Sequence, residues 1–406
     1  LTIYDGLREY AKIEPNTILH IKLDKRILDR ASESPLENFD MFAGNIEEHL
    51  GLKKDIIDNL KKAKTDENIQ GILLDMEFID AGVATVDEIR TALLDFKTSG
   101  KFIYSYSELY TQKAYYLASV ADSVFIYPEG VLEFRGLSAQ IPFLKGLLEK
   151  LEIQPQIIRG KNNKFKSAVE PFFLDKMSDA NREQTSKYVG AIWNHILKGI
   201  SESRHISVEN LTVIADSLHI RKAEDAVKYK LADALMYKDE LLAMLKEKTG
   251  AEDEKKIKFA TLKKYTRSVK EEEEDDDDGK GKFKKDKIAV IYAQGDIESG
   301  KGDNETIGSE RISEAIRKAR KDEKVKAIVL RVNSPGGSAL ASDVIWRELG
   351  MAKKVKPVIV SMGDVAASGG YYISCNADTI VASPVTITGS IGVFGVLPNT
   401  QKFFNN

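Results

Sequence analysis

Two stretches of this 406-residue chain resemble each other in a single register. A shift of 256 positions, with no gap, aligns identical residues at many points along roughly eighty residues. So long a register is hard to obtain by chance, and the chain is therefore predicted to contain two copies of one structural unit. The matches include Ile56 with Ile312, Lys62 with Lys318, Asp66-Glu67 with Asp322-Glu323, Ser105 with Ser361, Tyr115-Tyr116 with Tyr371-Tyr372, and Gly136 with Gly392.

Strand and helix patterns alternate in the first copy. Residues 15–23 alternate apolar and polar side chains, and residues 71–76 and 102–104 are apolar runs typical of buried strands. Residues 53–64 and 86–96 have apolar side chains at helical spacing. Strands and helices that alternate at this length favour an α/β fold with a largely parallel sheet.

The region between the copies predicts helices followed by a linker. Residues 177–250 show several helical patterns, and residues 271–278 are four glutamates followed by four aspartates. Eight like charges repel one another, so this run is interpreted as a solvated linker. A calcium site is the alternative, although the run lacks the spaced ligands and turn glycine of a calcium loop. The predicted division is an N-terminal repeat with a helical extension at 1–265, a charged linker at 266–286 and a C-terminal repeat at 287–406.

Charge and composition narrow the class of protein. The net charge is −3, which gives no general basic field for nucleic acid. The single cysteine, Cys375, cannot form an internal disulfide. The sequence has no apolar run near the roughly 18 residues of a membrane span and no opening signal peptide. It begins at Leu1 without a methionine, so we expect trimmed ends and draw little from a missing anchor.

The stretch from Val360 to Tyr372, V-S-M-G-D-V-A-A-S-G-G-Y-Y, has features of an acyl-transfer site. A strand at 358–360 is predicted to run into a tight Gly-Asp turn. Ser368 then lies among small residues, which leave its Oγ accessible, and Gly369 offers an unshielded backbone N–H for an oxyanion. The alternative is the glycine-rich start of a buried helix, in which Ser368 only fits a crowded crossing.

The two copies differ at these positions. Ser368 falls opposite Gln112, and the segment N-S-P-G-G-S at 333–338 falls opposite E-F-I-D-A-G at 77–82. The Gly336-Gly337 pair permits a backbone that turns N–H groups outward, which predicts a second oxyanion donor. The nucleophile and its oxyanion donors are therefore expected only in the second copy.

A serine nucleophile needs a base. All five histidines precede the second copy, so a Ser-His-Asp triad could form only across domains. A lysine can replace histidine if burial keeps it neutral near pH 7. The candidate is Lys166, which small and aromatic residues surround in K-N-N-K-F-K-S-A-V-E-P-F-F at 161–173. The alternative for Lys166 is a solvated surface cation.

Four motifs together resemble the signal peptide peptidase A family, also called protease IV, in its long tandem-repeat bacterial form. They are K-S-A-V-E-P-F at Lys166–Phe172, N-S-P-G-G-S, the stretch around Ser368, and T-G-S-I-G-V-F-G at Thr388–Gly395, in the family's order. The resemblance implies a crotonase/ClpP-like superhelix of ββα units. It also implies a Ser-Lys dyad with Ser368 as nucleophile, Lys166 as general base and Ser390 as the residue that positions the lysine. The oxyanion hole would come from the amides of Gly369 and of Gly336-Gly337.

The resemblance further implies a membrane-associated serine endopeptidase that degrades released signal peptides and other apolar peptides without metal or cofactor. It implies a homo-oligomer, expected as a tetramer, on the periplasmic face of the bacterial inner membrane, with an amino-terminal anchor that this chain lacks. The second copy should also continue beyond the chain's last motif. Two alternatives stay open at this stage: an acyl-CoA hydratase or isomerase of the crotonase class, and a non-catalytic scaffold of the same fold.

Overall fold

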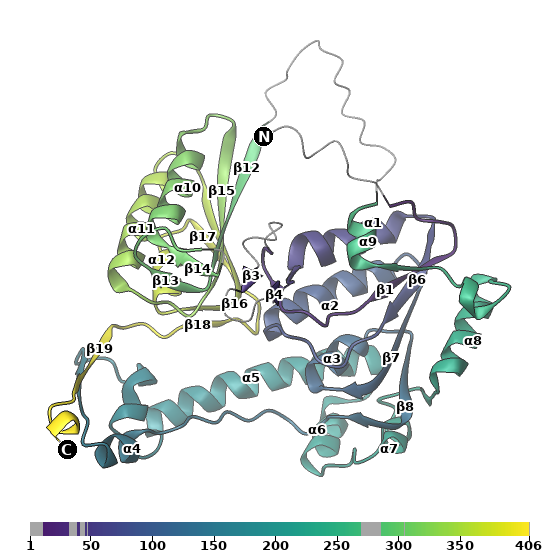
Figure 1. Cartoon of the computed structure of the whole chain (residues 1–406), viewed down its shortest axis with the longest axis horizontal. Coiled ribbons are helices and arrows are strands. Elements are labelled where there is room, and N and C mark those ends of the chain that lie inside the picture. Colours follow the sequence, from purple (N-terminus) through teal and green to yellow (C-terminus); the bar gives the residue numbers. More distant parts are fainter. Residues whose placement is uncertain are drawn as a thin grey trace. The chain divides into compact units, whose positions relative to one another are not determined.

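The computed structural model describes residues 11–31, 39–40, 45–46, 48–268, 286–303 and 305–405 (Figure 1). The chain divides into two compact units. Unit 1 comprises residues 1–136 and 196–283, and unit 2 comprises residues 137–195 and 284–406. The acidic run at 271–278 lies outside the described residues, so its interpretation as a linker stays a prediction.

Unit 1 is built on a six-stranded sheet in the order β10-β8-β7-β6-β1-β11. Every described pairing in this sheet is parallel. The central strands are buried on both faces, as parallel sheets require, because their crossover helices pack against them. The bounds are β1 (Thr17–Ile21), β6 (Ile69–Leu74), β7 (Phe102–Tyr110), β8 (Ser123–Leu132), β10 (Ala234–Leu235) and β11 (Phe259–Thr261).

The helices of unit 1 begin and end where the local sequence allows. A Ser207 side chain caps α6, accepting from the Asn210 N–H, and Gly250 ends α8 in the left-handed region at φ 67°. Short pairs, β2 (Ile27–Leu28) with β5 (Leu50–Gly51) and β3 (Phe39–Asp40) with β4 (Asn45–Ile46), complete the unit. The helices are a π-helical stretch Leu52–Ile57, α1 (Asp58–Thr65), α2 (Val83–Lys97), α3 (Gln112–Ala118), α6 (Val208–Asp216), α7 (Ala223–Lys228), α8 (Lys238–Thr249), a 3₁₀ turn Glu254–Lys256 and α9 (Leu262–Thr266).

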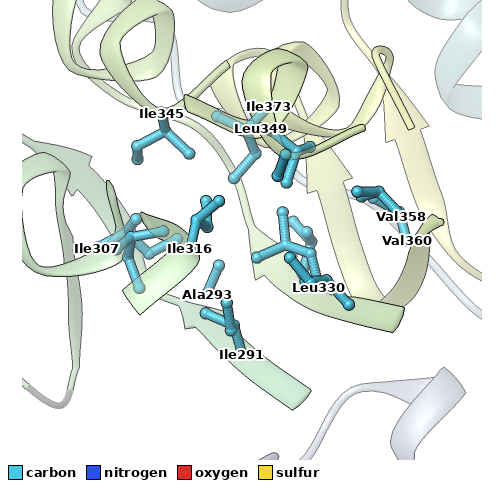
Figure 2. Close-up of a cluster of buried hydrophobic side chains, with 14 of the residues drawn as sticks. Ile291, Ala293, Ile307, Ile316, Leu330, Ile345, Leu349, Val358, Val360 and Ile373 are labelled. Carbon is cyan, nitrogen blue, oxygen red and sulfur yellow. The ribbon is translucent and has the colours of Figure 1, made fainter. Parts of the chain in front are cut away.

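Unit 2 contains the second parallel sheet, in the order β12-β15-β16-β17, with β18 also paired to β16. Figure 2 shows its core, where side chains from the sheet such as Leu330 and Val360 meet Ile316, Ile345 and Ile373 from the covering helices. The strands are β12 (Lys287–Gln294), β15 (Val325–Ser334), β16 (Val358–Ala367), β17 (Thr379–Val381) and β18 (Ile387–Gly389), with a separate parallel pair β13 (Asp296–Glu298) and β14 (Thr306–Gly308). The helices are α10 (Ser309–Lys321), α11 (Ala339–Lys353) and α12 (Gly369–Ser374).

The predicted repeat is confirmed by the two sheets. The order β1-β6-β7-β8 in unit 1 corresponds to β12-β15-β16-β17 in unit 2. Helix α2 at Val83–Lys97 and helix α11 at Ala339–Lys353 have the same bounds after the 256-residue shift. The α/β class with parallel sheets is confirmed with it.

A further segment of unit 2 carries Lys166. It runs through α4 (Lys145–Lys150), β9 (Gln154–Arg159), a 3₁₀ helix Ser167–Phe172 and the start of α5 (Asp179–Arg204). Strand β9 pairs antiparallel with β19 (Phe394–Asn399), from Arg159↔Phe394 to Gln154↔Asn399, and a 3₁₀ turn Phe403–Asn405 follows. Residues 137–195 thus belong to the same compact unit as the C-terminal repeat. The predicted division had placed them in the N-terminal repeat, at 1–265, because it followed the two sequence copies.

One local prediction is wrong. The Gly363-Asp364 pair was expected to form a tight turn, but β16 continues through it to Ala367. The reason is a bulge: β16 advances four residues from Met362 to Ala366 while β15 advances two, from Val332 to Ser334. In the part of the chain that the structure describes, no helix has the length and apolar character needed to cross a membrane.

Candidate active site

Ser368 lies at the junction of β16 and α12, half-buried, with φ 53° and ψ −116°. A non-glycine residue in this region of backbone space is strained, by about 1–3 kcal/mol, and such strain clusters at functional sites. The Ser368 N–H donates to Gly389 O at 2.8 Å, and Ser368 O accepts from the Tyr372 N–H at 2.9 Å. These two bonds fix the turn that presents the serine at the start of a helix.

The glycine pair after β15 lies against this turn. Gly336 has φ 106°, and a Cβ added to it would lie 2.5 Å from Gly369 N and 2.8 Å from Ser368 Cβ. The Gly336 N–H donates to Ser334 Oγ at 3.1 Å. Among the hydrogen bonds of the described residues, the N–H groups of Gly337 and Gly369 have no protein acceptor. Of the three glycine amides predicted for the oxyanion hole, that of Gly336 is thus already engaged, and those of Gly369 and Gly337 remain as candidates.

Lys166 is buried, with 3% of its surface exposed. Its Nζ donates to Ser390 O at 2.6 Å and to Ser390 Oγ at 3.2 Å. Burial lowers the pKa of the Lys166 ammonium from its ordinary value of 10.5, because the charged form loses solvent. The Phe394 ring lies 5.8 Å from the Lys166 Nζ and adds to the apolar surroundings. The alternative of a solvated surface cation does not fit this lysine.

A buried carboxylate holds the segment that carries Lys166. Glu170, 3% exposed, accepts from Ser178 Oγ at 2.6 Å, from the Ser178 N–H at 3.2 Å and from Asn181 Nδ2 at 2.9 Å. Gln184 Nε2 donates to Ser167 Oγ at 2.6 Å. The first turns of α5 thereby fix the 3₁₀ helix that begins directly after Lys166.

The lysine and the serine meet at the end of β18. From Val365, within its bulge, β16 pairs with β18, from Val365↔Ile387 to Ala367↔Gly389. Ser368 bonds to Gly389, and the next residue, Ser390, accepts from Lys166. The described residues show no direct hydrogen bond between Ser368 Oγ and Lys166 Nζ. Such bonds are often long without substrate and tighten when substrate binds. The structure therefore brings all the predicted site residues together within unit 2.

One of the five histidines can be placed in a local polar cluster. His20, in unit 1, lies 2.9 Å from Asp75 through Nε2, which makes it part of a local polar cluster. Within the described ranges, no group of three or more histidine, cysteine, aspartate or glutamate side chains is arranged to hold a metal ion.

Sequence reasoning missed the residues that support the site. Glu170 stood inside a motif already singled out, but its partners Ser178 and Asn181 carry no pattern of their own. Asn163, whose Nδ2 donates to Val393 O at 3.2 Å, was likewise not identified. The one available signal was the carboxylate of Glu170 in a stretch of small and aromatic residues, because a carboxylate that becomes buried there must find hydrogen-bond donors.

Comparisons with known proteins agree with one another. The model of a family described as peptidase family S49 matches residues 95–252 and 351–406. Protease 4 of Salmonella typhi is 41% identical over 357 residues, which cover 86% of this chain and 56% of that protein. The chloroplastic serine protease SPPA of Arabidopsis thaliana is 39% identical over 343 residues, which cover 83% of this chain and 49% of that protein. The chain spans about half the length of the curated relatives it matches.

Two solved structures each match about a quarter of the chain. A ClpP1 mutant of Listeria monocytogenes matches 22% of this chain and 46% of its own, with 21% identity and a TM-score of 0.18. A mutant of a membrane-bound stomatin-specific protease matches 24% of this chain and 44% of its own, with 25% identity and a TM-score of 0.21.

Proposed function

Because this chain belongs to peptidase family S49, we propose that it is a serine endopeptidase with Ser368 as nucleophile and Lys166 as general base. One observation carries the proposal: a buried lysine of lowered pKa and a strained serine are both hydrogen-bonded to the Gly389-Ser390 dipeptide. Neither burial of a lysine nor strain at a serine is needed for a parallel sheet to fold. Together they match what a Ser-Lys dyad requires.

The proposed reaction begins with proton transfer from Ser368 Oγ to neutral Lys166 Nζ. The Oγ forms a bond to the carbonyl carbon of the peptide, and the carbonyl oxygen becomes an oxyanion that accepts from Gly369 and Gly337. The C–N bond then breaks as the Lys166 ammonium protonates the leaving amine. Lys166 next takes a proton from water, whose oxygen attacks the ester carbon. The C–Oγ bond then breaks, and the Lys166 ammonium returns the proton to Ser368 Oγ. Each oxyanion donor contributes about 3 kcal/mol to stabilising the transition state.

We propose Ser390 as the residue that orients the base. Its carbonyl and hydroxyl both accept from Lys166 Nζ, so they direct the lysine amine without supplying a negative charge. An ion pair with a carboxylate would raise the pKa of the lysine and keep it protonated, whereas neutral acceptors leave the effect of burial in place.

Apolar peptides are the proposed substrates, with signal peptides among them. The segment that follows Ser390, the hydrogen-bond partner of Lys166, exposes large apolar side chains, including Ile391 at 71% and Val393 at 66%. An extended apolar peptide could lie along such a segment as an added strand. By the family resemblance we extend the proposal to a membrane-associated homo-oligomer, a tetramer facing the bacterial periplasm. Crosslinking and fractionation of the expressed protein would test both parts.

Hydrolysis of a quenched fluorescent peptide and labelling by a fluorophosphonate test the dyad. The Ser368→Ala and Lys166→Ala variants should each lose at least about a thousandfold in kcat, because members of such a unit cannot replace one another. Lys164→Ala is the matched control, since Lys164 is an exposed lysine two residues away. Near-normal turnover by either dyad variant would refute the assignment. Absence of both labelling and peptide hydrolysis in the folded wild type would favour the acyl-CoA or scaffold alternatives.

A further inference from the structure

The bulge in β16 is where the strand changes partner. Before the bulge, β16 pairs with β17 from Ile359↔Thr379 to Ser361↔Val381. From Val365, within the bulge, β16 pairs with β18, which ends at Gly389. Without the bulge, Ser368 would not reach the Gly389-Ser390 dipeptide that also receives Lys166. The position of the proposed nucleophile therefore depends on how this bulge is held.

A bulge leaves backbone groups without their strand partners, and these must be satisfied elsewhere. On one side, Thr386 Oγ1 donates to Gly363 O at 2.8 Å, and Thr388 Oγ1 donates to Ala366 O at 2.8 Å. On the other side, the Val365 N–H donates to Asn333 Oδ1 at 3.1 Å. Thr386 directly precedes β18 and Thr388 lies on it, but Asn333 comes from β15.

Asn333 also packs against the bulge. A Cβ added to Gly363 would lie 3.1 Å from Asn333 Cγ and 3.2 Å from its Nδ2, so the Asn333 amide lies close against the backbone of Gly363. Asn333 stands at the end of β15, three residues before Gly336 of the oxyanion loop. One side chain thus joins the strand that carries the oxyanion glycines to the strand that carries Ser368.

The first repeat satisfies the corresponding backbone amide within a single strand. The position corresponding to Val365 is Leu109, and its N–H donates to Ser107 Oγ at 3.2 Å, on the same strand. The position corresponding to Asn333 is Glu77, whose side chain is exposed. The copy without a nucleophile therefore satisfies this amide locally, and only the copy with Ser368 does so from the neighbouring strand.

We infer that Asn333 is a positioning residue, which couples the oxyanion loop to the turn of Ser368 through the Val365 amide. This inference rests on the proposed serine-peptidase function. Removing the side chain should leave the sheet intact but allow the bulge and the glycine loop to move independently. The serine and the oxyanion donors would then lose their relative placement, while substrate binding and the base remain.

The test compares Asn333→Ala, Asn333→Asp and Ser107→Ala in the full chain. Ser107→Ala is the matched control, because it removes the same kind of amide acceptor from the repeat that lacks the serine. We expect Asn333→Ala to lower kcat and the fluorophosphonate labelling rate about ten- to a hundredfold, as for a small misplacement of reacting groups, with KM within about twofold. Asn333→Asp keeps an acceptor for the Val365 N–H and should restore most of the rate.

The pH profile separates positioning from a change at the base. Since the described hydrogen bonds of Lys166 do not involve Asn333, the Asn333→Ala profile should keep the wild-type midpoint at a lower plateau. A merely structural role predicts that Ser107→Ala slows labelling as much as Asn333→Ala for an equal loss of melting temperature, and that result overturns the inference. So does wild-type labelling of a folded Asn333→Ala chain. If the wild type itself is neither labelled nor active, the proposed function fails first, before any variant is compared.

Discussion

Replacing Gly336 by alanine gives the sharpest test of the oxyanion loop. The added Cβ would lie 2.5 Å from Gly369 N, 2.8 Å from Ser368 Cβ and 3.0 Å from Ala367 O. Distances under 3.0 Å do not occur between real Cβ atoms and their neighbours, so the loop and the serine turn must separate. The neighbouring atoms include backbone, which cannot rotate away as the end of a flexible side chain can.

The structure sets the magnitude of the effect. Alanine at a positive φ costs about 1–2 kcal/mol in backbone energy, and overpacking adds about 1–3 kcal/mol. We therefore expect Gly336→Ala to lose about 2–5 kcal/mol of folding stability. The loss of an aligned oxyanion donor should in addition lower kcat by about a hundred- to a thousandfold.

Gly100→Ala is the matched control for strain. Gly100 has φ 77°, and a Cβ added there would meet nothing within 4 Å. It should lose about 1–2 kcal/mol of stability without loss of activity. Peptide hydrolysis and fluorophosphonate labelling would be measured well below each variant's melting temperature. Wild-type labelling by a folded Gly336→Ala chain would refute the assigned oxyanion geometry, and equal loss of activity in Gly100→Ala would refute the claim that the effect is local.

Three further predictions concern the base. Because only neutral Lys166 can accept the proton and its pKa is lowered from 10.5, kcat/KM should rise with pH, by about tenfold per unit, and level off below 10.5; a fall across that range in a pH-rate profile would contradict the role. Ser390→Ala keeps the carbonyl acceptor and removes only the hydroxyl, so steady-state kinetics should show a loss of about fivefold, near 1 kcal/mol, and a loss as large as that of Lys166→Ala would mean that Ser390 does more than orient the base. Glu170→Ala leaves the three donors of Ser178 and Asn181 unsatisfied, so chemical denaturation should show a loss of stability of about 2–4 kcal/mol, and kcat should fall as well. Glu183 is an exposed carboxylate on α5, and Glu183→Ala should change neither quantity.

The sequence predicted the architecture well because the repeat and the apolar runs are local signals. The helices expected at 53–64 and 86–96 are found, with the first beginning in a π-helical stretch, and the strand expected at 15–23 is β1. The strand expected to end near Val360 continues to Ala367, since a bulge depends on partners from other strands. The periodicity of apolar residues in the sequence does not indicate those partners.

The candidate site could likewise be predicted only in part from the sequence. Ser368 and the glycines could be identified from the sequence as small residues in a predicted turn. Lys166 could be identified only through the family resemblance, because one lysine among many has no distinguishing pattern. The Gly336 N–H is already bonded to Ser334 Oγ, which leaves the Gly337 N–H as the proposed oxyanion donor. This choice depends on the φ of Gly336 and on a hydroxyl two residues away. Such choices become visible only in three dimensions.

The pairing of β9 with β19 has a consequence for when the proposed site can assemble. Lys166 and Ser390 are 224 residues apart in the chain, and the ribbon between them cannot form until both have been synthesised. At ordinary translation speeds of about 5–20 residues per second, that interval is roughly 10–45 seconds. During it, the lysine lacks the surroundings that lower its pKa and stays protonated. Under the proposed function, a nascent chain therefore cannot cleave itself or its neighbours until β19 has been synthesised.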